Sequence, residues 1–190
     1  MKIITGQKGY TFIELLAVIM IMITVGTVIA SILVSTLRSG NKNNSLSDIR
    51  QNGNTAILQM SKMIEYAKSF DGVSTNGLDF TSCITPTPIP LSPTPTPVPY
   101  YFVKITSFDN NQTTFGCYNE ILASTSSTLG EVRLVSANTN ANCYFFCTQD
   151  SYSTSPTIQF LLTLSTKNRG PLPENNASMS FKTSVTVRNY

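Results

Sequence analysis

The sequence predicts an α+β protein in which a long N-terminal helix packs on an antiparallel β-sheet of four to six strands. Residues Leu15–Leu37 form an uncharged apolar run, long enough at about 1.5 Å per residue to cross a hydrocarbon core as a helix. Toward the other end of the chain, Met179–Val187 alternates apolar and polar residues, as a strand with one buried face does.

The residues before the apolar run carry two lysines and one acidic side chain. Lys2 and Lys8 precede Gly9, and Glu14 stands directly before Leu15. An ionisable group inside a membrane span costs about 2.5–3.5 kcal/mol by insertion scales, so a carboxylate at the threshold of one indicates a function.

The stretch Lys8-Gly9-Tyr10-Thr11-Phe12-Ile13-Glu14-Leu15-Leu16 resembles the class III signal of type IV pilins and of the pseudopilins of type II secretion systems. In that family a membrane peptidase cuts after Gly, the new first residue is methylated, and Glu is the fifth mature residue. The resemblance implies a prepilin leader over residues 1–9, leader peptidase cleavage between Gly9 and Tyr10, N-methylation of Tyr10, and a role in assembly for Glu14. Tyr10 departs from the Phe or Met that is usual there.

Two other interpretations of this stretch stay open. A secretory signal peptide has an apolar region of about 7–15 residues, whereas this run is longer and Thr27–Ser31 is a poor cleavage site. An ordinary signal anchor explains the length and the lysines but has no need of Gly9 or Glu14. A carboxylate that reaches the headgroups without a partner is the alternative for Glu14 itself.

Helical periodicity resumes beyond the apolar run, in a stripe expected to pack on the sheet and widened by Ile57 and Ile64: Leu46, Ile49, Gly53, Ala56, Met60, Met63 and Ala67. We therefore expect a transmembrane helix over residues 10–37, the outer half of the same helix over 38–70 with its end near Ser69, and an extracytoplasmic β-rich domain over 71–190. Arg50–Phe70 and Thr186–Tyr190 resemble the minor pseudopilins of the J type.

Five segments of the β-rich domain are predicted as strands: Tyr100–Phe108, Thr113–Tyr118, Glu131–Ser136, Ile158–Thr166 and Met179–Val187. Residues 85–99 form a proline-rich loop with seven prolines, which favours polyproline II geometry. It is predicted as a tolerated surface insertion, with a semi-rigid spacer or docking ligand as the alternative.

Four cysteines follow the apolar run: Cys83, Cys117, Cys143 and Cys147. Two disulfides are predicted, and the sequence leaves all three pairings open. Cys143 and Cys147 can bridge each other only in a helical or looped arrangement, because an extended strand would hold them about 13 Å apart. A four-cysteine zinc site is the alternative, although only one side has the usual spacing.

Composition argues against catalysis and against nucleic acid as a main partner. The net charge is +3 without a basic block, and the chain has no His, the commonest general base and metal ligand. The sequence has no nucleophile–base pattern, Gly-rich phosphate loop or acidic metal cluster. We therefore predict no enzyme activity, catalytic residue, metal or cofactor.

The resemblance implies a structural subunit, a minor pilin or pseudopilin, of a type IV pilus or type II secretion-like filament. It would be anchored in the cytoplasmic (inner) membrane by a single pass, with its N-terminus inside and its C-terminal domain outside. Its partners would be a prepilin peptidase/methyltransferase, other pilins or pseudopilins, and inner membrane lipids. The alternatives are a major pilin and a surface binding subunit, either an adhesin or a subunit for DNA uptake.

Overall fold

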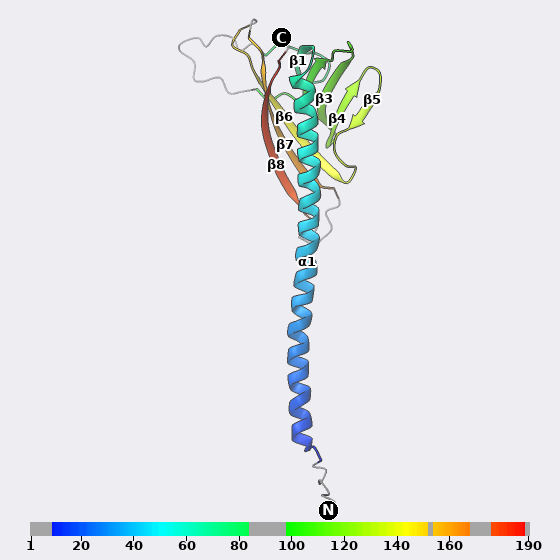
Figure 1. The fold of residues 1–190 in the computed structure, drawn as a ribbon, viewed down its shortest axis with the longest axis vertical. Coiled ribbons are helices and arrows are strands. Elements are labelled where there is room, and N and C mark those ends of the chain that lie inside the picture. The colour runs from blue at the N-terminus through cyan, green and yellow to red at the C-terminus, as the bar shows by residue number, and fades with distance from the viewer. Residues whose placement is uncertain (1–8, 84–97, 152–153, 168–175, 189–190) are drawn as a thin grey trace, which may run out of the picture. The chain divides into compact units, whose positions relative to one another are not determined.

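The computed structural model describes residues 9–83, 98–151, 154–167 and 176–188. The chain divides into two compact units, Met1–Asn41 and Lys42–Tyr190, which are treated separately below. Helix α1 (Phe12–Glu65) begins in the first unit and ends in the second, and every described strand lies in the second (Figure 1). One long, apolar N-terminal helix and antiparallel strands confirm the predicted α+β class. Most of the predicted leader and proline-rich loop falls outside the described residues.

The strands form two antiparallel sheets, of five and three strands, where the sequence predicted a single antiparallel sheet of four to six strands. The first sheet follows sequence order: β1 (Ser69–Ser74), β2 (Phe102–Thr106), β3 (Gln112–Tyr118), β4 (Ile121–Ser126) and β5 (Gly130–Arg133). The second contains β6 (Thr139–Thr148), β7 (Thr157–Thr166) and β8 (Ser178–Thr186). The sheet divides after β5 because β6 pairs along its whole length with β7 and not with β5.

The sequence failed to predict three strands, β1, β4 and β6. Strand β6 carries Asn140 and Asn142, and β4 carries Ala123, and both residue types are depleted in strands. These segments are extended because they pair with stronger neighbours: β6 with the apolar β7, and β4 with β3. Cross-strand pairing and burial, not local preference, decide their conformation.

Helix α1 ends at Glu65, four residues before the predicted end near Ser69. The Lys68 N–H donates to the carbonyl of Thr106 (2.8 Å), and Ser69 already pairs with Thr106 in the first sheet. Pairing with β2 thus takes over the backbone groups that a longer helix would use. Gly72 lies beside a bulge inside β1 and has a φ of +126°.

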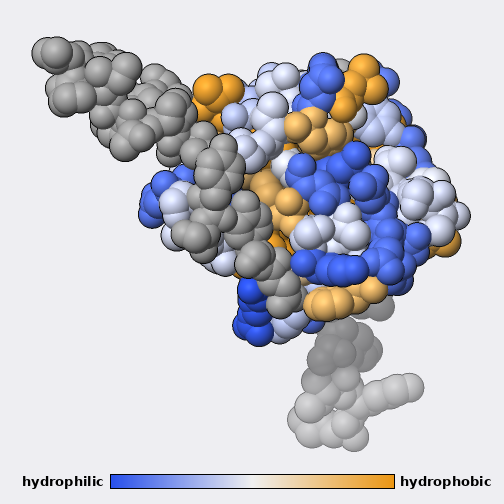
Figure 2. Space-filling view, turned by 90° about the horizontal axis from the view of Figure 1, so that it is seen from above, coloured by the Kyte–Doolittle hydropathy of each residue, from blue (hydrophilic) through white to orange (hydrophobic). Residues whose placement is uncertain are grey.

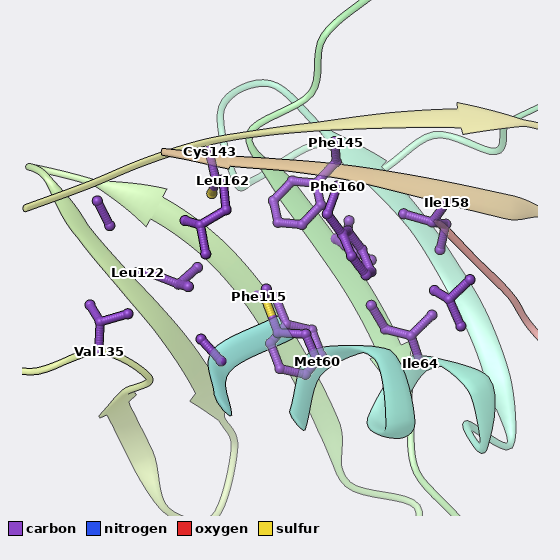
Figure 3. Packing of buried hydrophobic residues seen from close by; sticks show 14 of the residues in the cluster. Met60, Ile64, Phe115, Leu122, Val135, Cys143, Phe145, Ile158, Phe160 and Leu162 are labelled. Carbon is purple, nitrogen blue, oxygen red and sulfur yellow. The ribbon is translucent and has the colours of Figure 1, made fainter. Parts of the chain in front are cut away.

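The second unit has one hydrophobic core, to which α1 and both sheets contribute. Figure 3 shows Met60 and Ile64 of α1 below side chains from the strands, among them Phe115, Phe145 and Phe160. The predicted stripe on α1 is confirmed at its fully buried members, Ile49, Gly53, Ala56 and Met60. Ile64, predicted to widen the stripe, is also buried, whereas Met63 is exposed, because a straight helix drifts away from an alternating 3-4 spacing.

The alternation in β8 is confirmed, since Val185 is buried while Ser184 and Thr186 are exposed. The strand ends at Thr186, one residue before its predicted end. Arg188 then binds to the end of α1 in two ways. Its backbone N–H donates to the Glu65 carbonyl (3.1 Å), and its guanidinium forms an ion pair with the Glu65 carboxylate (2.7 Å). A cation at a helix C-terminus also interacts favourably with the helix dipole.

We expect Gly53→Ala to lower the free energy of unfolding by about 1–3 kcal/mol. An added Cβ would overlap the ring of Phe181, which packs directly on this glycine. Gly40→Ala is the matched control, because Gly40 is also helical but has no atom within 4 Å of the added Cβ. It should stabilise the helix by about 0.5–1 kcal/mol. Denaturation of the full chain in zwitterionic micelles measures both, and equal stabilisation by the two substitutions would contradict the packing argument.

Candidate functional site at the start of helix α1

Thr11 caps the N-terminus of α1 and so places Glu14 in the first helical turn. The Glu14 N–H donates to the carbonyl of Thr11 (3.1 Å) and lies 3.4 Å from its hydroxyl. Thr11-Phe12-Ile13-Glu14 has the spacing of a capping box, in which the third helical residue is Glu or Gln. This signal was present in the sequence, and our interpretation of Glu14 did not use it.

The residues implied in processing and assembly lie together at this end of α1. Gly9 and Tyr10 directly precede the cap, and the Tyr10 side chain is 87% exposed. Glu14 is exposed as well, and among the described residues no cation pairs with its carboxylate. The helix dipole favours a negative charge here, and it would disfavour an isolated positive charge at a newly formed N-terminus.

Four hydroxyl groups in the apolar part of α1 are hydrogen-bonded within the helix itself. The hydroxyls of Thr24, Thr27, Ser31 and Thr36 donate to helix carbonyls three or four residues earlier, at 2.8–2.9 Å. These groups therefore need no water, which suits a helix in hydrocarbon. By length and composition α1 can cross a membrane, and none of its most apolar window is buried by the rest of the chain.

Figure 2 shows a mosaic of hydrophilic and hydrophobic residues over the face of the second unit in view, without one broad apolar area. The apolar side chains of α1 between Leu15 and Leu37 are, in contrast, exposed one after another. So large an apolar surface calls for a covering of lipid or of other helices.

The cysteines form two disulfides, Cys83–Cys147 and Cys117–Cys143, with Cα atoms 5.3 Å and 5.7 Å apart. Disulfide formation is as predicted, and the structure selects one of the three open pairings. Cys143 and Cys147 both lie on the extended strand β6, where they do not bridge each other. All four thiols are used in this way, so the alternative of a four-cysteine zinc site is excluded.

A strained turn forms a second distinctive feature, at the tip of the β3–β4 hairpin. Asn119 and Glu120 connect the two strands with φ values of +49° and +62°. Positive φ at both central residues is typical of a type I′ turn, where Asn-Gly is the preferred pair and Glu is unusual. The Glu120 carbonyl accepts a hydrogen bond from the Ala141 N–H (2.8 Å), which holds the turn against β6.

We expect Glu120→Gly to stabilise the domain by about 1 kcal/mol, because glycine adopts this backbone conformation without a steric cost. Glu120→Ala is the control, since it removes the carboxylate but keeps the Cβ. A thermal melt of each variant measures the effect. Equal gains from both substitutions would mean that the charge, and not the backbone, is the source of strain.

No model of a known protein family matches the chain, and neither a curated protein sequence nor a solved structure matches it.

Proposed function

We propose that this protein is a prepilin-like structural subunit that assembles through its N-terminal helix into a type IV pilus or a type II secretion-like filament. The observation that carries the proposal is Glu14, five residues after Gly9 in the capped first turn of an exposed apolar helix, whose carboxylate has no cationic partner among the described residues. The fit of Lys8–Leu16 to the class III signal supports the same proposal.

Cleavage after Gly9 would release a free amine at Tyr10. An amine is positively charged at neutral pH, since its ordinary pKa is about 7.7–8.0. This charge and that of Glu14 are each costly to keep in a medium of low dielectric constant, and they attract each other strongly there. The amine of one subunit would therefore pair with Glu14 of a neighbour and set their register as the subunits leave the bilayer.

The proposed setting is the cytoplasmic (inner) membrane, crossed once, with the N-terminus inside and the disulfide-bonded domain outside. A prepilin peptidase would cut the leader and methylate Tyr10. We propose a minor subunit because the globular part is large and carries a proline-rich insertion, and because Arg50–Phe70 and Thr186–Tyr190 are similar to J-type minor pseudopilins.

The abundance of the chain in filaments sheared from cells tests the minor role. A minor pilin or pseudopilin is expected as a trace component, or only in the membrane fraction. Dominance in the filaments would make the protein a major pilin. The pocket described next favours a second candidate function, that of a surface binding subunit.

A further inference from the structure

A pocket of about 570 Å³ lies between the β3–β4 turn and the second sheet. The side chains that shape it are Tyr101, Tyr118, Asn119, Asn140, Asn142 and Ser165. Asn140 and Asn142 alternate along β6 with the buried Ala141 and Cys143, so they lie on the face of the sheet opposite to the core. The pocket thus belongs to the outer surface of the second unit.

Two aromatic rings are held in fixed positions at this pocket. Tyr101 is 37% exposed, and its ring lies 5.6 Å from the ring of Tyr144. The carboxylate of Glu131 interacts with the hydroxyl of Tyr118 and raises the pKa of Tyr118 above its usual value, chiefly by hydrogen bonding. A ring that is held in this way offers a flat apolar surface at little cost in conformational entropy.

Around the rings lie amide and hydroxyl groups that the protein leaves available. The side chains of Asn119, Asn140 and Ser165 line the pocket and make no hydrogen bond with any other described residue. Each Asn amide has both donors and an acceptor, so it can bind a hydroxyl group in either direction. The set suits a ligand that is rich in neutral hydroxyl groups.

The charge of the lining narrows the class of ligand. Glu120 is the one charged residue among the described residues that line the pocket, and Lys and Arg are absent from that set. Phosphate, sulfate and nucleic acid need cationic partners, so the lining disfavours them. An uncharged ligand with apolar C–H faces and polar hydroxyl edges fits both the rings and the amides.

We propose that this pocket binds a neutral carbohydrate, with a sugar ring stacked on Tyr101 and its hydroxyls bound by Asn140 and Asn119. Specific pockets combine aromatic surface with a few well-placed polar groups in this manner. The inference depends on the second unit alone and holds whether or not α1 assembles into a filament.

Saturation-transfer NMR tests the proposal on the full chain, in phosphocholine micelles that are free of glycoside detergents. Maltotriose, cellotriose and tri-N-acetylchitotriose are the probes, at millimolar concentration. We expect at least one of them to receive saturation from the protein. Tyr101→Ala and Asn140→Ala should each weaken its binding on the order of tenfold, the size of one lost stacking or hydrogen-bonding contact.

Asn54→Ala is the matched control, because Asn54 is an exposed asparagine on α1 that does not line this pocket. The Asn54→Ala variant should bind the sugar as tightly as the unmodified chain does. If the Tyr101→Ala variant fails to fold, the affinity of the Asn140→Ala variant for the sugar still tests the proposal. Three results would overturn the proposal: none of the three sugars binds, binding survives Asn140→Ala, or a peptide with the proline-rich sequence of residues 85–99 binds in place of the sugars.

Discussion

Glu14→Gln is expected to reduce incorporation of the subunit into filaments by about a hundredfold or more, while cleavage after Gly9 continues. Removing one partner of a buried ion pair costs about 3–5 kcal/mol, and each 1.4 kcal/mol is a factor of ten. Gln also serves at the third position of a capping box, so the first turn of α1 keeps its cap. The substitution therefore separates the charge of Glu14 from its structural role at the cap.

Quantitative mass spectrometry of sheared filaments and of membranes measures this effect as a ratio. Asp48→Asn is the matched control, since it removes an exposed carboxylate from α1 in the second unit. The Asp48→Asn variant should enter filaments as efficiently as the unmodified subunit does. Normal incorporation of Glu14→Gln would mean that Glu14 only caps the helix or reaches the headgroups, and the assembly role would be wrong.

Loss of either disulfide is expected to cost about 2–4 kcal/mol of unfolding free energy, because each closes a long loop in the unfolded chain. The sequence separations are 64 residues for Cys83–Cys147 and 26 residues for Cys117–Cys143. The double variant Cys117→Ala with Cys143→Ala should lose one disulfide and keep the other. All four cysteines are present in the structure as disulfides, so such a variant should have no free thiol.

The mismatched variant Cys83→Ala with Cys143→Ala is the control for the pairing. It should lose both disulfides, titrate two free thiols, and be destabilised about twice as much as the matched variant. Thiol titration measures the number of free thiols, and denaturation independently measures the loss of unfolding free energy. Two free thiols in the matched variant, and none in the mismatched one, would show that Cys83 pairs with Cys143 instead.

The parts of the fold that follow from local pattern were predictable from the sequence. The apolar run predicted α1, and the alternation of Met179–Val187 predicted β8, because burial of one face leaves a direct periodic trace in the sequence. The buried stripe at Ile49, Ala56 and Met60 was predicted for the same reason.

The remainder depends on contacts between distant segments, which a single sequence does not encode locally. The end of α1 at Glu65 is fixed by pairing with β2, and the division into two sheets by the pairing of β6 with β7. The disulfide pairing likewise depends on the placement of β3 and β6. The pocket at Asn119 and Asn140 brings together residues of the β3–β4 turn and of β6, so no spacing in the sequence marked it.

The N-terminal peptide of the mature protein tests the central claim most directly. The chain is expressed with a prepilin peptidase, recovered from membranes, and its first peptide is identified by mass spectrometry. The account predicts a peptide that starts at Tyr10 and carries an N-methyl group. A peptide that still starts at Met1, or a cut near Ala30, would contradict it and would favour a signal anchor or a secretory signal peptide.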